Sequence, residues 1–198
     1  MWAVLPAKDF RNAKKRLSPV LKPQERRTLF AVMLEDVLEA ATSAPSLDGV
    51  LVITRDPQAI SLAHKYNAEI HIEPENDGQS AAVARAAHHL DKIKRGGLLT
   101  LPGDTPNLQP NEIEAVIAQH RPPPSMSIVP SHDQLGSNCI VLTPPKLIPF
   151  HFGHKSLQPH LKEAAKRNIN PTIHNDMPGL GLDIDTPSDL ALFLKNGG

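Results

Sequence analysis

Short apolar runs alternate along the chain with longer segments in which apolar positions recur every three or four residues. The run at residues 50–54 is continuously apolar and largely β-branched, which is typical of a parallel strand covered on both faces. The segment after Pro23 instead carries its apolar residues at helical spacing. The pattern predicts strands at residues 2–5, 50–54, 69–72, 97–101, 126–129, 138–142 and 172–174. It predicts helices at residues 24–44, 57–66, 78–93, 111–120, 156–167 and 187–194.

Strands that alternate with helices through short links indicate an α/β fold with a mostly parallel sheet and helices on both faces. A chain of 198 residues with 40% hydrophobic content can bury one sizeable core. The proline run at 122–124 reads as a stiff corner rather than a domain boundary. We therefore expect a single domain that spans residues 1–198.

The composition limits which kinds of binding partner and which cellular compartment are expected for this protein. Lys+Arg and Asp+Glu balance at 21 each, so the chain lacks the basic field expected of a nucleic-acid binder. The single cysteine, Cys139, excludes an internal disulfide, reads as a buried inert thiol and fits a reducing compartment. The apolar start before Lys8 is too short for a signal peptide, and no run approaches the ~18 apolar residues of a membrane span. The expectation is a cytoplasmic protein without nucleic-acid or membrane partners.

Three aspartates are the most informative chemical feature. Asp104 stands in Leu-Pro-Gly-Asp-Thr-Pro, and Asp183 and Asp185 stand in Gly-Leu-Asp-Ile-Asp-Thr-Pro. Each follows a short apolar run and is expected to lie near the end of a strand, so a further strand is expected through Asp183 and Asp185. Ligands of open α/β sheets gather at the carboxyl ends of strands, and residues two apart on a strand share one face. Three carboxylates that meet there suit Mg²⁺ together with substrate phosphates. The alternative is that these residues cap the helices that follow them, because Asp before Thr-Pro is a common helix start.

Two further segments are candidates for binding anions. Residues 8–16 carry five cations directly after the first predicted strand, where Lys8 could reach a triphosphate; the alternative is a solvated basic loop. Gly153 and Ser156 open a predicted helix, where free backbone N–H groups can bind a phosphate or carboxylate, unless Ser156 is an ordinary helix cap. Ser137 lies in a Gly-Ser-Asn segment that offers further donors or is a plain turn. The ten histidines form no convincing metal set.

Metal carboxylates, cations and an anion pocket without an obvious general base fit nucleotidyl transfer to a phosphate. A phosphate monoester is largely ionised at neutral pH and is already a nucleophile. The protein must then align it with the α-phosphate of a nucleoside triphosphate and neutralise charge.

Several motifs together resemble one family. They are Trp-Ala-Val-Leu-Pro-Ala-Lys at the start, Pro-Gly-Asp-Thr-Pro, Gly-Ser-Asn, Phe-Gly-x-x-Ser-x-x-x-His at 152–160 and Asp-Ile-Asp-Thr-Pro-x-Asp-Leu at 183–190. In this order and over the whole length, they resemble the CofC/FbiD guanylyltransferases of coenzyme F420 biosynthesis. The resemblance implies a GT-A-like nucleotidyltransferase fold. It also implies that GTP reacts with 2-phospho-L-lactate, phosphoenolpyruvate or 3-phosphoglycerate and that pyrophosphate is released.

The resemblance also assigns residues. Asp104, Asp183 and Asp185 would hold Mg²⁺ and, with Lys8, would form the catalytic set. The acid would be held by Ser137, Gly153 and Ser156. The nucleotide would be held by Pro6, Lys8, Lys14, Arg16, Gly78, Gln79, Ser80 and Asp104.

One segment departs from the family pattern, which usually shows Gly-Leu-Asn-Ala-Ala where this chain has Gly78-Gln79-Ser80-Ala81-Ala82. The asparagine amide is lost there, and Gln79 or Ser80 could contact the nucleobase instead. Two alternatives remain on sequence grounds: another GT-A-like enzyme of the molybdenum-cofactor or sugar-phosphate type, and a catalytically silent nucleotide-binding protein. The oligomeric state is not fixed by the sequence, and a homodimer is left open.

Overall fold

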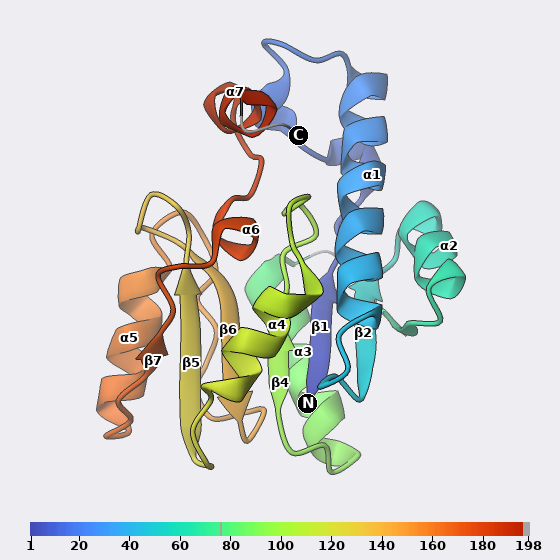
Figure 1. Cartoon of the computed structure of the whole chain (residues 1–198). Helices are drawn as coiled ribbons and strands as arrows, with labels where there is room; N and C mark the ends of the chain where they lie inside the picture. The colour runs from blue at the N-terminus through green and yellow to red at the C-terminus, as the bar shows by residue number, and fades with distance from the viewer. Residues whose placement is uncertain (76, 196–198) are drawn as a thin grey trace.

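The chain folds around one seven-stranded sheet, seen in a computed structural model that describes residues 1–75 and 77–195 (Figure 1). The spatial order of the strands is β3-β2-β1-β4-β6-β5-β7. The strands are β1 Trp2–Pro6, β2 Gly49–Thr54, β3 Glu69–Ile72, β4 Leu98–Thr100, β5 Ser125–Pro130, β6 Ser137–Thr143 and β7 Thr172–Ile173.

One strand runs against the others. β1, β2, β3 and β4 pair in parallel, and β5 pairs in parallel with β7, whereas β6 is antiparallel to both β4 and β5. The mostly parallel sheet expected from the sequence is therefore confirmed. Because β6 is reversed, it begins at the edge where the parallel strands end, so Ser137 lies on the same edge as the residues after β1 and β4.

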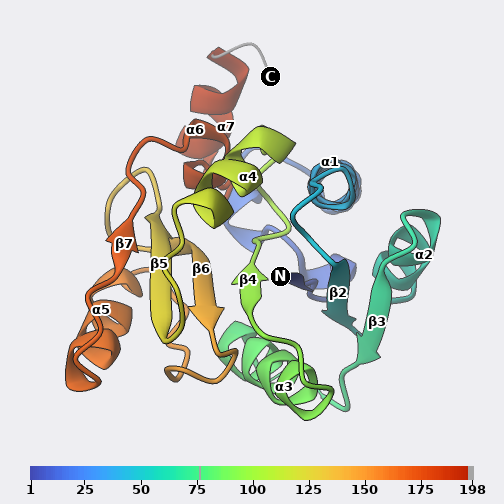
Figure 2. The same cartoon turned by 60° about the horizontal axis from the view of Figure 1, so that its bottom comes forward.

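Helices cover both faces of the sheet (Figure 2). α1, α2 and α4 pack on one face, where Leu34 of α1 and Leu5 of β1 belong to one buried cluster. α3 and α5 pack on the other, where Val83 of α3 joins Val4 of β1. The helices are α1 Pro23–Thr42, α2 Pro57–Lys65, α3 Gln79–Lys92, α4 Pro110–Ala118, α5 Leu157–Lys166, α6 Pro178–Gly181 and α7 Pro187–Lys195, with 3₁₀ turns at Phe10–Asn12 and Lys15–Leu17.

The apolar run of β1 illustrates why the central strands are hydrophobic throughout. Successive side chains of a strand point to opposite faces, so Trp2 and Val4 enter one core while Ala3 and Leu5 enter the other. None of the helices in the described ranges is long and apolar enough to cross a membrane.

The expected strand through Asp183 and Asp185 is wrong. Residues 182–185, all within the described part of the chain, form no strand and connect the short helix α6 to α7. The Ile184 N–H donates to the Asp104 carbonyl, which belongs to a loop rather than a strand, so no ladder can form. The alternation that suggested a strand is nevertheless present, because Leu182 and Ile184 are buried while the two carboxylates face outward from the core.

Candidate active site

A cleft of about 700 Å³ opens at the edge of the sheet where the parallel strands end and β6 begins. Eleven of the residues singled out in the sequence line it: Pro6, Lys8, Lys14, Arg16, Gln79, Asp104, Ser137, Gly153, Ser156, Asp183 and Asp185. Gly78 and Ser80 are not among the described residues that line the cleft.

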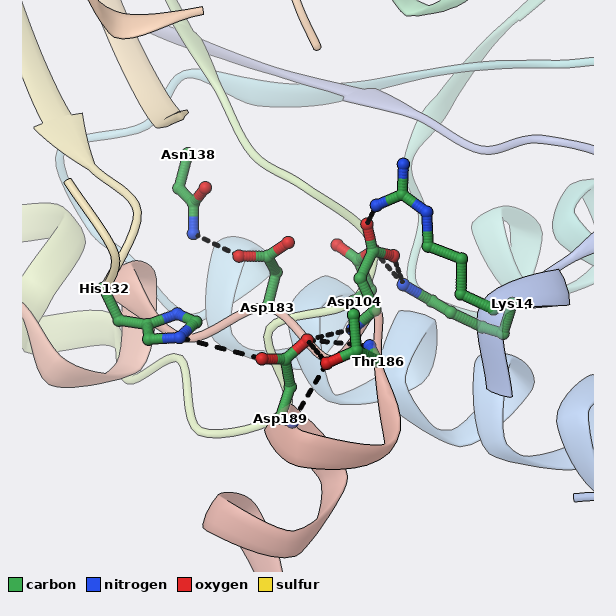
Figure 3. A network of polar contacts seen from close by, with 9 residues as sticks. Lys14, Asp104, His132, Asn138, Asp183, Thr186 and Asp189 are labelled. Carbon is green, nitrogen blue, oxygen red and sulfur yellow. Dashed lines mark hydrogen bonds and ion pairs between the residues drawn. The ribbon is translucent and has the colours of Figure 1, made fainter. Parts of the chain in front are cut away.

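The three aspartates line this cleft together. Figure 3 shows Asp104 and Asp183 beside Lys14 and Asn138. Asp104 follows β4, and Asp183 and Asp185 lie between α6 and α7. One carboxylate oxygen from each lies within 4.8 Å of the other two. The hydrogen bond from the Ile184 N–H to the Asp104 carbonyl, 3.0 Å long, holds the two segments in this register. Three hard oxygen donors so close together could hold a divalent cation.

The alternative that these aspartates cap the following helices does not agree with the structure. Helix α7 is capped by Thr186 and Asp189: the Asp189 carboxylate accepts the Thr186 N–H at 2.7 Å, and the Thr186 hydroxyl accepts the Asp189 N–H at 3.3 Å. Helix α4, which follows Asp104, is capped by Gln109 and Glu112. The candidate metal carboxylates therefore have no capping role in these two helices.

Asp183 carries an unusual charge environment. Burial, and secondarily the neighbouring Asp104 charge, raise the pKa of Asp183 to about 6, while a hydrogen bond from the Asn138 amide opposes this rise. That bond is 3.0 Å long, and the same amide group donates to the carbonyls of Leu180 and Gly181 at the end of α6. Asn138 thus fixes both the acidic segment and the orientation of its carboxylate.

Lys14 is the cation that balances the cluster. Its ammonium group donates to Asp104, and to Asp185 at 2.8 Å, and its side chain is only 4% exposed. Burial disfavours the charged ammonium, but the two carboxylates outweigh it and raise the pKa of Lys14. Burial likewise acts to raise the pKa of Asp185, but Lys14 and then Arg16 outweigh it and hold that pKa below its usual value. Three carboxylates meet here and two cations, Lys14 and Arg16, pair with them, so negative charge remains that a divalent cation could neutralise.

The basic loop that carries Lys14 is held by apolar anchors. Phe10 and Leu17 are fully buried, and the Phe10 ring packs edge-on against Phe30 of α1 at 4.8 Å between centroids. The Asp56 carboxylate accepts the Phe10 N–H at 3.0 Å while it also caps α2. The segment is therefore not a freely solvated loop, although Lys8 and Arg16 remain exposed at the cleft.

Ser156 and Ser137 also line the cleft and are linked to each other. The Ser156 hydroxyl accepts the Ser137 N–H at 2.9 Å and, among the described residues, makes no capping bond to its own helix. The reading of Ser156 as an ordinary cap is therefore wrong. The expected free helix N-terminus is also reduced, because the Leu157 N–H donates to Leu135 and Pro159 has no N–H to donate.

In the segment that departs from the family pattern, Gln79 and Ser80 lie in different environments. Gln79 faces the cleft, whereas the Ser80 hydroxyl accepts the Phe152 N–H at 2.8 Å. Gly78 precedes α3 with φ +100°, a conformation that side chains rarely adopt. Ser80 thus supports the backbone next to Gly153, and Gln79 is the member of the pair whose side chain can meet a ligand.

Sequence reasoning missed several supporting residues. The side chain of Asn138, the Thr186–Asp189 pair and His132, whose Nε2 lies 3.7 Å from Asp189, all brace the acidic segment. His160 was part of a recognised motif but received no role. The signal for Asp189 was available, because Thr-Pro-Ser-Asp is a capping pattern at a helix start.

Solved structures with the same fold define the class of protein. A nucleotidyl transferase from Methanothermobacter thermautotroptrophicus aligns with a TM-score of 0.73 at 15% identity, over 98% of this chain and 96% of that one. A CMP:2-keto-3-deoxy-manno-octonic acid synthetase complexed with CTP aligns with a TM-score of 0.65 at 15% identity, over 98% of both chains. The fold is that of the nucleotidyltransferases, as expected.

The chain belongs to the CofC-like guanylyl transferase family, whose family model matches residues 1–198. It is 33% identical to a phosphoenolpyruvate guanylyltransferase of Rubrobacter xylanophilus, over 100% of this chain and 95% of the relative. It is also 33% identical to a 3-phospho-D-glycerate guanylyltransferase of Colwellia psychrerythraea, over 96% of this chain and 89% of the relative. A 2-phospho-L-lactate guanylyltransferase of Methanobrevibacter ruminantium is 29% identical, over 100% of this chain and 86% of the relative. The protein is therefore a nucleotidyltransferase of the guanylyl-transferring kind.

Proposed function

We propose that this protein transfers GMP from GTP to the phosphate of a phosphorylated three-carbon acid in coenzyme F420 biosynthesis, with release of pyrophosphate. The acid is phosphoenolpyruvate, 2-phospho-L-lactate or 3-phosphoglycerate, the substrates in the names of the relatives. The observation that carries the proposal is the meeting, in one cleft, of three carboxylates, a basic loop and two linked serines.

Asp104, Asp183 and Asp185 are proposed to hold Mg²⁺. One oxygen of each lies within 4.8 Å of the other two, and the three carboxylates outnumber the two cations, Lys14 and Arg16, that pair with them, so the cluster favours a further cation. When bound, the ion would neutralise phosphate charge that develops during transfer. Carboxylates rather than thiols or imidazoles form this cluster, which matches the oxygen preference of Mg²⁺.

The basic loop is proposed to face the triphosphate. Lys8 and Arg16 reach the cleft from the segment after β1, together with Pro6 at the end of that strand. Lys14 supports the carboxylates from the same loop. Gln79 is proposed to contact the nucleobase, with Gly78 and Ser80 shaping the turn beside it.

The acid is proposed to lie against Ser137, Gly153 and Ser156 on the far side of the carboxylates. Its phosphate needs no general base, because it is largely ionised at neutral pH. An oxygen of that phosphate forms a bond to the α-phosphorus while the bond to the bridging oxygen of the β-phosphate breaks. The residues of the cleft align the two groups and neutralise charge.

A pyrophosphate-release assay tests this proposal. The protein is mixed with Mg²⁺ and each of four nucleoside triphosphates crossed with the three acids. We expect release that depends on both GTP and one of the acids, and loss of at least ~100-fold in Asp104→Asn. Outright preference for ATP or CTP would contradict guanylyl transfer. Release of pyrophosphate without any acid would contradict the assignment of a phosphorylated acid as the acceptor.

The proposed location is the cytoplasm. Cys139 is the single cysteine of the chain, and it is free and fully buried in β6. Burial raises the pKa of its thiol, which makes it a poor partner for a disulfide.

A further inference from the structure

We infer that His160 is a positioning residue that makes the Ser137 hydroxyl of the acid pocket face the cleft as a hydrogen-bond donor. The inference rests on the proposed function and adds a residue to which no role has been given. His160 lies on α5, one turn after Ser156, and is fully buried.

The hydrogen bonds of His160 determine which ring nitrogen carries the proton. The His151 N–H donates to Nε2 at 2.8 Å, so Nε2 must be an unprotonated acceptor. In the neutral ring the proton then lies on Nδ1, which is 3.0 Å from the Ser137 hydroxyl oxygen. The ring is also packed edge-on against Phe152 at 5.1 Å between centroids, which limits its rotation.

The ring is neutral at physiological pH. Burial, and secondarily the neighbouring His151, lower the pKa of His160 to about 4. The neutral ring keeps Nε2 as the acceptor of the His151 N–H, so its single proton stays on Nδ1, which faces Ser137.

As a consequence, two hydrogen bonds, from His160 to Ser137 and from Ser137 to Ser156, act on serine hydroxyls that line the cleft. The Ser137 hydroxyl accepts from His160, so its own proton is available for an acceptor outside this chain. The Ser137 N–H donates to the Ser156 hydroxyl, whose proton is likewise left for another acceptor. Both serines line the cleft. Each hydroxyl oxygen already accepts one hydrogen bond from this protein, which leaves its proton as the group that still needs a partner.

Such a pocket selects its ligand by chemistry. A carboxylate or phosphate oxygen is only an acceptor and satisfies both hydroxyl protons. A ligand that presents a donor would leave polar groups unpaired, which costs affinity. The hydrogen bond from His160 to Ser137, called the relay below, therefore favours an oxyanion of the acid substrate at this point of the cleft.

Two amide substitutions that differ in length by one methylene group separate the two hydrogen bonds of His160. In His160→Asn the amide nitrogen can occupy the place of Nδ1 and donate to Ser137, while the acceptor for His151 is lost. In His160→Gln the amide oxygen can occupy the place of Nε2 and accept from His151, while the donor to Ser137 is lost. The KM of each substrate in pyrophosphate release and the calorimetric Kd of the acid are measured for both variants.

We expect His160→Gln to raise the KM and Kd of the acid about 10-fold, the effect of about 1.4 kcal/mol from one hydrogen bond. His160→Asn should retain affinity within about 3-fold, and the KM of GTP should change little in either variant. In a Ser137→Ala background, which itself weakens the acid, the glutamine substitution should have no further effect, because the two changes remove the same interaction.

Equal effects of the asparagine and glutamine variants would overturn the relay, as would a glutamine effect that persists undiminished in the Ser137→Ala background. If the wild type binds the acid without releasing pyrophosphate, the proposed reaction fails, and the Kd values still decide the relay. If no acid binds the wild type, both proposals fail. Circular dichroism and Tm of each variant exclude misfolding. Should the buried histidine not tolerate replacement, the ¹⁵N chemical shifts of the wild-type His160 ring decide the matter: a proton on Nδ1 is expected, and a proton on Nε2 would overturn the relay.

Discussion

At the scale of single residues, the three aspartates differ in their surroundings. Asp185 is paired with Lys14 and Arg16, whereas Asp183 accepts from the neutral Asn138 amide and has no ion-pair partner among residues 1–75 and 77–195. The pKa of Asp185 is lowered and that of Asp183 is raised to about 6. Asp183 is therefore the carboxylate whose proton must leave before a divalent cation can bind, because metal ligands bind in the deprotonated form.

This difference predicts the behaviour of Asp183→Asn. The folded protein holds the Asp183 proton up to about pH 6, above the ordinary value of 3.8, so the folded state binds more protons than the unfolded state between these values. The contribution of Asp183 to the stability of metal-free wild type should accordingly fall as pH rises from 4 to 6, and this contribution should be lost above that window. Asp183→Asn removes this dependence and should be about 1–2 kcal/mol more stable than wild type at pH 7.5 without metal.

Urea unfolding in EDTA across this pH range measures the effect, and turnover with Mg²⁺ should fall at least ~100-fold in the same variant. Parallel pH curves for the two proteins would contradict the burial argument. Unchanged turnover of Asp183→Asn would show that Asp183 does not hold the metal ion.

A second residue-scale prediction concerns Gln79 and Ser80. Gln79 faces the cleft, so Gln79→Leu should reduce the preference for GTP over ATP about 10-fold, because an amide offers a donor and an acceptor to a purine edge. Ser80 supports Phe152 instead, so Ser80→Ala should leave that preference unchanged and raise the KM of the acid. Values of kcat/KM for both nucleotides and the acid decide the matter; a swapped pattern would assign base reading to Ser80.

At the scale of elements, the short helix α6 places the acidic segment. The Gly179 N–H donates to Glu112 of α4 at 2.8 Å, and the carbonyls of Leu180 and Gly181 accept from Asn138. A Cβ atom at Gly179 would overlap the Glu112 side chain and the Asn107 carbonyl. The close contact of α6 with α4 therefore depends on a residue without a side chain.

Gly179→Ala should consequently displace α6 and cost about 1–3 kcal/mol of stability, as overpacking does. The displacement moves Asp183, so the affinity for Mg²⁺ should also fall. Gly96→Ala is the matched control, because a Cβ atom there meets no atom within 4 Å, and its stability should stay within about 0.5 kcal/mol of wild type. Thermal unfolding with and without Mg²⁺ measures both effects, and equal behaviour of the two variants would exclude α6 as the support of the site.

The sequence predicts the sheet well and the support of the site less well. Period-two and helical patterns locate the strands and main helices because burial on two faces leaves strong signals. The strand expected through Asp183 is wrong because alternation reports burial of every second residue and not the presence of a pairing strand. α6, a single turn of Pro-Gly-Leu-Gly, has no periodicity to detect. The pairing of Lys14 with Asp185, 171 residues apart, is set by topology alone.

At the scale of the whole molecule, the cleft brings together two segments that lie near opposite ends of the sequence. The basic loop after β1 and the segment before α7 lie together above the sheet (Figure 1). Lys14 connects them through its contacts with Asp104 and Asp185. Without metal, this one buried ammonium group offsets the mutual repulsion of the carboxylates.

Lys14→Met tests this role. The variant should lose about 1.5–3 kcal/mol of stability in EDTA, the range for hydrogen bonds to charged groups, because two carboxylates lose their partner. Mg²⁺ should then raise the Tm of the variant by more than it raises the Tm of wild type. A ligand that binds the folded state stabilises that state, and in the variant the ion also relieves the carboxylate repulsion that Lys14 offsets in wild type. Lys15→Met is the matched control: Lys15 lines the same cleft but is exposed, so its removal should change the Tm in EDTA little. Equal Mg²⁺-induced shifts in wild type and Lys14→Met would mean that Lys14 and the cation act at separate places, and the assignment of Mg²⁺ to this cluster would then fall.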